Sequence, residues 1–97
     1  MPNSDDIFPP YRPPDWFPLK RALASVFGVP AVDAAASFWF VGFVAGPVDV
    51  GELRVYERSG TRRTLTLDSQ GSAYRWKVEI GTYVRVDDEE ALVEALV

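Results

Sequence analysis

Four basic side chains within a short stretch are the part of this sequence whose chemistry most suggests a ligand. Arg62, Arg63, Arg75 and Lys77 lie in TRRTLTLDSQGSAYRWKVEI, residues 61–80. Guanidinium and ammonium groups bind carboxylates and phosphates. A cluster of them therefore predicts a surface for an acidic protein or for a nucleic acid, unless it is only the solvated side of a sheet.

The charges are unevenly distributed along the chain. Residues 52–85 hold seven basic and four acidic side chains, whereas the rest of the chain holds three basic and ten acidic ones, so the whole carries a formal charge of −4. A basic middle between acidic ends favours steering toward a complementary protein surface. The negative total opposes long-range attraction to a polyanion.

Most of the usual catalytic chemistries are absent from the 97 residues. There is no histidine and no cysteine, which excludes Ser–His and Cys–His nucleophiles, zinc sites that need either ligand, and disulfides. The densest acidic run, residues 87–90, is better explained by helix capping, because consecutive residues on a helix point in different directions. We therefore expect no enzyme, no metal and no cofactor.

Two helices are expected at the ends of the folded part of the chain. In DWFPLKRALASVFG, residues 15–28, Asp15 is placed to cap a helix and Pro18 is tolerable in its first turn. One face of that helix would be apolar, and Gly28 would end it. This face consists of Trp16, Leu19, Leu23, Val26 and Phe27. The last segment, from residue 87, has Asp87 and Glu90 at the spacing of a capping box.

Between the helices the sequence predicts five strands. The uncharged SFWFVGFV, residues 37–44, is typical of a central strand that is covered on both faces. ELRVYER, RTLTLD, AYRWKVEI and YVRV follow with turns so short that neighbours must pair antiparallel. The expected fold is α+β: an antiparallel sheet of about five strands, packed against an N-terminal helix and a short C-terminal helix.

Alternation along the strands predicts one apolar and one cationic face. The apolar face would carry Leu53, Val55, Leu65, Leu67, Trp76, Val78 and Val84 and lie under the helices. The other face would carry Arg54, Tyr56, Arg58, Thr64, Thr66, Arg75, Lys77, Glu79, Tyr83 and Arg85. The candidate binding residues are Arg54, Tyr56, Arg58, Arg62, Arg63, Arg75, Lys77, Tyr83 and Arg85.

The first fourteen residues are predicted to be an extended, proline-rich arm, and residues 15–97 a single domain. The arm's aromatic residues Phe8 and Tyr11, together with Trp16, would fold back as a strap over the domain. Two alternatives stay open. The arm could bind an aromatic groove in another protein, because Pro10 and Pro13 have P-x-x-P spacing, or it could exchange between the protomers of a homodimer.

These observations favour a non-enzymatic, small acidic protein that binds another protein and acts by occupying its surface. Size and charge place it by analogy beside accessory and inhibitor proteins of the immunity, antitoxin and anti-defence type. The alternatives are single-stranded nucleic-acid binding through the basic face and a structural or assembly subunit, for example of a phage particle. No secretion signal or membrane span is visible, so we expect a cytoplasmic protein without a membrane partner.

Overall fold

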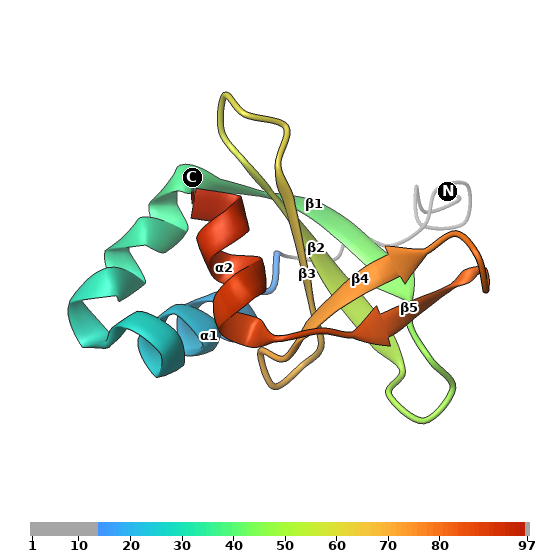
Figure 1. The fold of residues 1–97 in the computed structure, drawn as a ribbon. Helices are drawn as coiled ribbons and strands as arrows, with labels where there is room; N and C mark the ends of the chain where they lie inside the picture. Colours follow the sequence, from blue (N-terminus) through green and yellow to red (C-terminus); the bar gives the residue numbers. More distant parts are fainter. Residues whose placement is uncertain (1–13, 97) are drawn as a thin grey trace, which may run out of the picture.

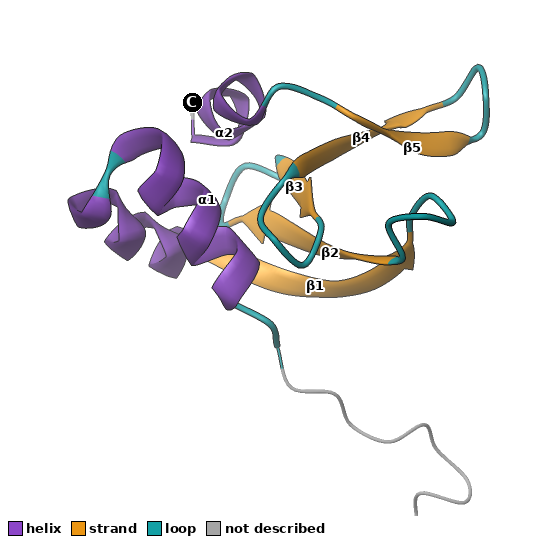
Figure 2. Cartoon of the chain, turned by 90° about the horizontal axis from the view of Figure 1, so that it is seen from below, coloured by secondary structure: helices purple, strands orange, loops and turns teal. Residues whose placement is uncertain are grey.

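The computed structural model describes residues 14–96, which form an α+β fold as predicted (Figure 1). In chain order the elements are α1 (Phe17–Phe27), η2 (Val29–Ser37), β1 (Phe38–Ala45), β2 (Glu52–Arg58), β3 (Thr64–Leu67), β4 (Ala73–Lys77), β5 (Thr82–Arg85) and α2 (Asp88–Leu96). The five strands make one antiparallel sheet in the order β1-β2-β3-β4-β5. In both ribbon views the helices gather at one end, and the β4–β5 hairpin extends away from them (Figures 1 and 2).

Helix α1 begins one residue later than its sequence predicts, with Trp16 and not Asp15 at the N-cap position. Asp15 makes no capping hydrogen bond, because its carboxylate instead accepts a hydrogen bond from Arg54 Nε at 3.0 Å. Pro18 lies in the first turn, and Gly28 ends the helix with φ of 96°, as expected. Leu19 and Leu23 are completely buried, so the 3.6-residue period identified the centre of the buried side correctly. Phe27, predicted on the same face, is 40% exposed at the end of the helix.

The helical segment η2 was not predicted. It is a 3₁₀ helix that follows Gly28 directly and carries a proline at its start. The positive φ of Gly28 turns the chain, and a proline has no backbone N–H to continue the hydrogen bonds of α1. The segment ends where Ser37 Oγ donates to the carbonyl of Ala34 at 2.7 Å, and β1 begins.

The core lies between the helices and one side of the sheet, which we call the helix face. Its strand residues are Phe38, Tyr56, Leu65, Leu67 and Ala73, each at most 5% exposed. Helices α1 and α2 cover them with Leu19, Leu23, Leu92 and Ala95. Burial of these apolar side chains is the main favourable term in folding.

The register of the strands contradicts the predicted division into an apolar and a cationic face. Tyr56 pairs with Leu65, and Val55 pairs with Thr66, whereas the prediction placed Val55 beside Leu65. Each side of the sheet therefore receives part of both predicted sets. On the helix face, five residues of the predicted cationic set, Arg54, Tyr56, Arg58, Arg75 and Lys77, lie beside the apolar Leu65, Leu67 and Val84. On the opposite face, the apolar Leu53, Val55 and Trp76 lie beside Thr64, Thr66, Tyr83 and Arg85.

Tyr56 is the physical reason for this register. Its ring buries more apolar area than Val55 could, and its hydroxyl donates a hydrogen bond to the backbone carbonyl of Asp15. A tyrosine that finds an acceptor inside the core loses nothing by being buried. Arg54 follows it onto the helix face and is accommodated at the strand end, where it pairs with Asp15.

Strand β1 is also placed differently from its prediction. It forms an edge of the sheet and not a central strand. Trp39 is 66% exposed and Val41 is 59% exposed, so β1 is not covered on both faces. A bulge between Phe40 and Gly42 interrupts its pairing with β2.

The predicted arm lies largely outside the described residues, and so do Phe8 and Tyr11. Trp16, the third predicted contact of the arm, is half-buried. Its ring lies 5.9 Å from that of Tyr56 and 6.3 Å from that of Phe40, measured between centroids. Trp16 therefore closes the core at the start of α1.

Candidate interaction site

The β4–β5 hairpin carries three large apolar side chains that are exposed. Trp76 is 50% exposed, Val78 78% and Ile80 64%. The sequence predicted β4 to continue to Ile80 within the core, and the structure contradicts this. The chain turns after Lys77, whose carbonyl accepts hydrogen bonds from the backbone N–H groups of Ile80 and Gly81.

One feature of the sequence and one of the structure explain the turn. Gly81 has φ of 64°, in the left-handed region that favours glycine, so it closes a tight turn at little cost. Strand β3 pairs with β4 only as far as Tyr74, so the far end of β4 has no partner on that side. The glycine could be recognised in the sequence, whereas the end of the pairing could not.

Trp76 is held in place by a neighbouring ring on the next strand. It pairs with Tyr83 across the hairpin, and the two ring centroids are 5.2 Å apart at an interplanar angle of 71°. Such edge-to-face pairs add about 0.5–1.5 kcal/mol beyond the area they bury. The hairpin therefore presents an ordered aromatic surface.

A cleft opens beside the hairpin, where β4 diverges from β3. The two strands pair only at Thr66 with Tyr74 and at Leu67 with Ala73. Beyond these pairs lies a cleft of about 320 Å³, bounded by β2, β3, the hairpin and α2. It is lined by apolar and polar side chains, among them Val55, Thr66, Trp76, Tyr83 and Glu94.

Tyr74 borders this cleft with its hydroxyl near Asp68. Burial raises the pKa of the Tyr74 hydroxyl, and the negative charge of Asp68 raises it further. Asp68 accepts hydrogen bonds from the backbone N–H groups of Gln70 and Ser72 at 2.9 and 3.0 Å, which fixes the turn between β3 and β4. Tyr74 is therefore neutral at physiological pH and serves to shape the wall of the cleft.

Three of the predicted binding arginines are ion-paired within the protein. Arg54 pairs with Asp15 at 3.0 Å, Arg75 pairs with Glu94, and Arg85 pairs with Asp88 at 2.8 Å. Asp88 also accepts a hydrogen bond from the backbone N–H of Ala73 at 2.8 Å. These pairs attach α1 and α2 to the sheet.

Two further arginines donate to the end of α2. Arg58 binds the carbonyl of Leu96, and Arg63 binds that of Glu94 at 3.3 Å. The last carbonyls of a helix have no partner within it, and cations near them are favourable. Arginine from the sheet thus completes a helix that has no basic residue in its last turn.

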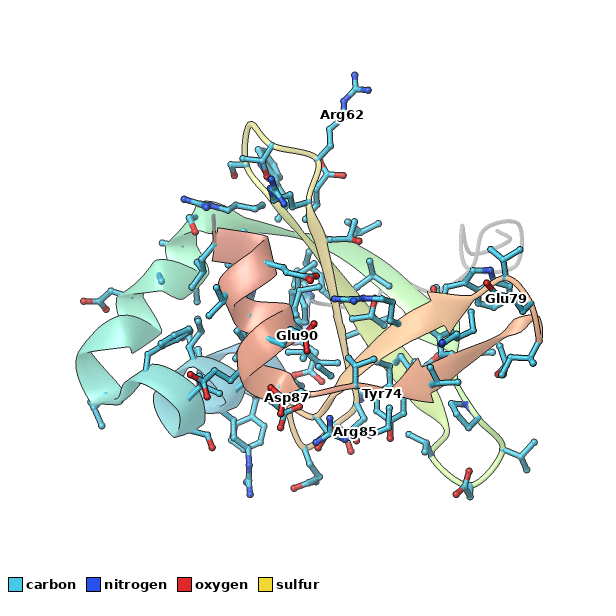
Figure 3. The ribbon with its side chains drawn as sticks, viewed as in Figure 1. Arg62, Tyr74, Glu79, Arg85, Asp87 and Glu90 are labelled. Atoms are coloured by element: carbon cyan, nitrogen blue, oxygen red, sulfur yellow. The ribbon has the colours of Figure 1, made fainter. Side chains whose placement is uncertain are left out.

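Arg62 and Lys77 complete the predicted set of basic residues. Within residues 14–96 the side chain of neither residue makes a hydrogen bond or an ion pair. Arg62 lies at the end of the β2–β3 loop, pointing away from the body, while Lys77 lies on the hairpin, whose turn also carries Glu79 (Figure 3). The predicted basic residues therefore do not converge on one surface. Tyr56 is buried, and Tyr83 supports Trp76.

Comparison with protein-family models, with curated proteins and with solved structures found no match for this chain. No helix in residues 14–96 combines the length and apolar character needed to cross a membrane. In the same residues, no three carboxylates are grouped so that they could hold a metal ion.

Proposed function

We propose that this chain is a non-enzymatic protein-binding module of the accessory or inhibitor type, and that it occupies its partner's surface with the β4–β5 hairpin. The observation that carries the proposal is the exposure of Trp76, Val78 and Ile80 on an element that extends beyond the rest of the fold. Exposed apolar groups of this size on a soluble domain are typical of interaction sites.

The composition of the hairpin agrees with the anatomy of protein interfaces. Such interfaces have a centre rich in aromatic residues and a polar rim. Trp76 would be the centre, since tryptophan is enriched among the residues that dominate binding energy. Lys77 and Glu79 would form the rim, where charges set the rate and specificity of association. Binding through surface contacts requires no catalytic group, which agrees with a sequence that contains neither histidine nor cysteine.

The pairing of the arginines favours the hairpin over nucleic-acid binding, which stays the main alternative. It required several arginines on one face with tyrosine rings between them. Arg54, Arg75 and Arg85 are instead paired with carboxylates, and Tyr56 is buried. A structural or assembly subunit remains compatible with the hairpin as a contact surface, and a cytoplasmic location remains part of the proposal.

A photoreactive residue in place of Val78 tests the proposed contact directly. Expressed in the source organism and irradiated, the Val78 variant should form a covalent adduct with one discrete protein. The matched control is Val48, which is fully exposed in the β1–β2 turn and should give no such adduct. Adducts of equal intensity at both positions, or none at Val78, would contradict the proposal.

Once the partner is identified, affinity should depend on Trp76. Trp76→Ala removes the centre of the surface and should weaken binding by at least about 30-fold, the effect of losing roughly 2 kcal/mol. Phe17→Ala is the matched control, because Phe17 is a similarly exposed aromatic residue but lies at the start of α1. Isothermal calorimetry should show less than a twofold change for this control.

A further inference from the structure

The two edges of the sheet are protected to very different degrees. Strand β5, at one edge, has four residues and includes Arg85. Strand β1, at the other edge, has eight residues and contains neither charge nor proline. Natural proteins shorten or charge their edge strands, because an exposed row of backbone N–H and C=O groups is a template for another strand. Edge β1 is neither short nor charged, and the protection that it carries is the single bulge between Phe40 and Gly42.

The side chains of β1 are also suited to being covered. Trp39 and Val41 are 66% and 59% exposed, and adding a strand beside them would remove apolar surface from water. Since β1 carries no charge, a strand of the same composition could lie alongside it without like-charge repulsion. This matters for a chain with a net charge of −4, whose copies otherwise repel one another.

The bulge makes β1 symmetric about its own centre. Phe38 and Ala45 point to the helix face, and Trp39 and Val44 point to the opposite face, as their partners on β2 show. Val41, at the centre, has no partner on β2. Without the bulge, the two ends of an eight-residue strand would point to different faces. With it, the pattern of faces is the same when read from either end.

We propose that β1 pairs antiparallel with β1 of a second copy, around a two-fold axis between Val41 and Gly42. In this register Trp39 lies opposite Val44 of the second copy, and Phe38 lies opposite its Ala45. Paired residues then point to the same side of both sheets, so the two helix faces remain continuous and the exposed Trp39 is covered. In this isologous contact the β1 edges of both copies are paired with each other, and only the two short β5 edges stay unpaired. The assembly is therefore a closed dimer with a ten-stranded sheet and not a filament.

The mass of the purified full chain tests the proposal. Light scattering after size-exclusion chromatography should give twice the chain mass of 10.8 kDa. Val41→Lys places a charge at the centre of the edge and should give the single-chain mass, while its circular dichroism spectrum at 25 °C stays that of the folded wild type. Its melting temperature should no longer depend on protein concentration. Val78→Lys, on the hairpin, is the matched control and should remain dimeric. A monomeric wild type, a dimeric Val41→Lys protein or a polymer would overturn the proposal.

The register can be measured separately. The chain has no cysteine, so Ala45→Cys gives a single attachment site for a spin label at an exposed position. The two labelled Cα atoms of the proposed dimer are seven residues apart along the paired strands, about 24 Å at ~3.4 Å per residue. Double electron–electron resonance should show one distance near this value. The absence of dipolar coupling, or a clearly different distance, would refute the proposed register. Because Val41→Lys should leave the photoadduct at Val78 intact, failure of the dimer and failure of the hairpin contact are distinguishable.

Discussion

At the scale of single residues, the arginines and Tyr56 act within the fold. Arg58 and Arg63 complete the last turn of α2, and Arg54 holds Asp15 beside the core. Tyr56 brings a hydroxyl into an apolar region and satisfies it with the carbonyl of Asp15. A buried polar group without a partner costs more than a paired one gains, so this hydrogen bond is a condition for the observed register.

Tyr56→Phe should lower the free energy of unfolding by about 1–2 kcal/mol, since the carbonyl of Asp15 loses its partner while the ring stays in place. Tyr83→Phe is the control, because it keeps the ring contact with Trp76 and should change stability by less than about 0.5 kcal/mol. Urea titration of both variants measures the difference. Equal effects would show that the hydroxyl of Tyr56 contributes nothing particular.

The same residue predicts alkaline sensitivity. Burial raises the pKa of Tyr56 well above the ordinary tyrosine value of 10.0, and the charge of Asp15 raises it further. A raised pKa in the folded state means that stability is complete below pH 10 and falls as the pH rises above it, because the unfolded chain ionises first. The decline between pH 10 and pH 11.5 should be shallower in Tyr56→Phe, measured as unfolding free energy against pH.

At the scale of elements, the turn between β3 and β4 fixes how closely the sheet approaches α1. Gly71 has φ of 89°, and a Cβ there would lie 2.8 Å from the carbonyl oxygen of Pro18 and 3.3 Å from the backbone nitrogen of Ala22. Gly60 also has a positive φ, of 79°, but nothing lies within 4 Å of its Cβ position. Both glycines therefore have a positive φ, but only at Gly71 would a Cβ collide with α1.

Alanine at these two positions separates the two effects. Gly60→Ala should cost about 1–2 kcal/mol, the strain of a left-handed alanine. Gly71→Ala should cost about 1–3 kcal/mol more, because α1 must also move away from the turn. Urea denaturation measures both variants, and similar losses would indicate that α1 can shift without cost.

At the scale of the whole molecule, the charges are distributed so that pairs form between the basic sheet and the acidic ends. Asp15, Asp88 and Glu94 come from the acidic parts of the sequence, and each meets an arginine from residues 52–85. Part of the charge segregation that suggested a ligand is therefore used in ion pairs within the protein. It attaches the helices to the sheet, with the modest energy expected of partly exposed ion pairs.

We therefore expect no measurable binding to a single-stranded oligonucleotide, even at low salt, because the net charge is negative and three of the candidate arginines are paired with carboxylates. Fluorescence anisotropy with a labelled oligonucleotide measures this. The opposite result would be tight binding that falls steeply with salt and is lost in the Arg75→Glu, Lys77→Glu double variant. That result would favour nucleic-acid binding over the hairpin contact as the function.

The sequence by itself determined helices α1 and α2 and the order of the five strands, though not η2, because these elements depend on local chemistry. Pro18, Gly28 and the Asp87–Glu90 spacing bounded the helices, and Asp87 does accept a hydrogen bond from the backbone N–H of Glu90 at 2.9 Å. Short turns imposed antiparallel pairing. These signals act over a few residues, so they can be recognised without knowing the rest of the chain.

Only the tertiary structure decided which side of each strand is buried and which strand is an edge. Alternation is a property of one strand, whereas a face is shared only through register, and a shift of one residue exchanges the faces. That register depended on whether Tyr56 would find an acceptor in Asp15, 41 positions away. The exposure of Trp76 likewise followed from the divergence of β4 from β3 beyond Tyr74, so the candidate site could not be identified from its own residues alone.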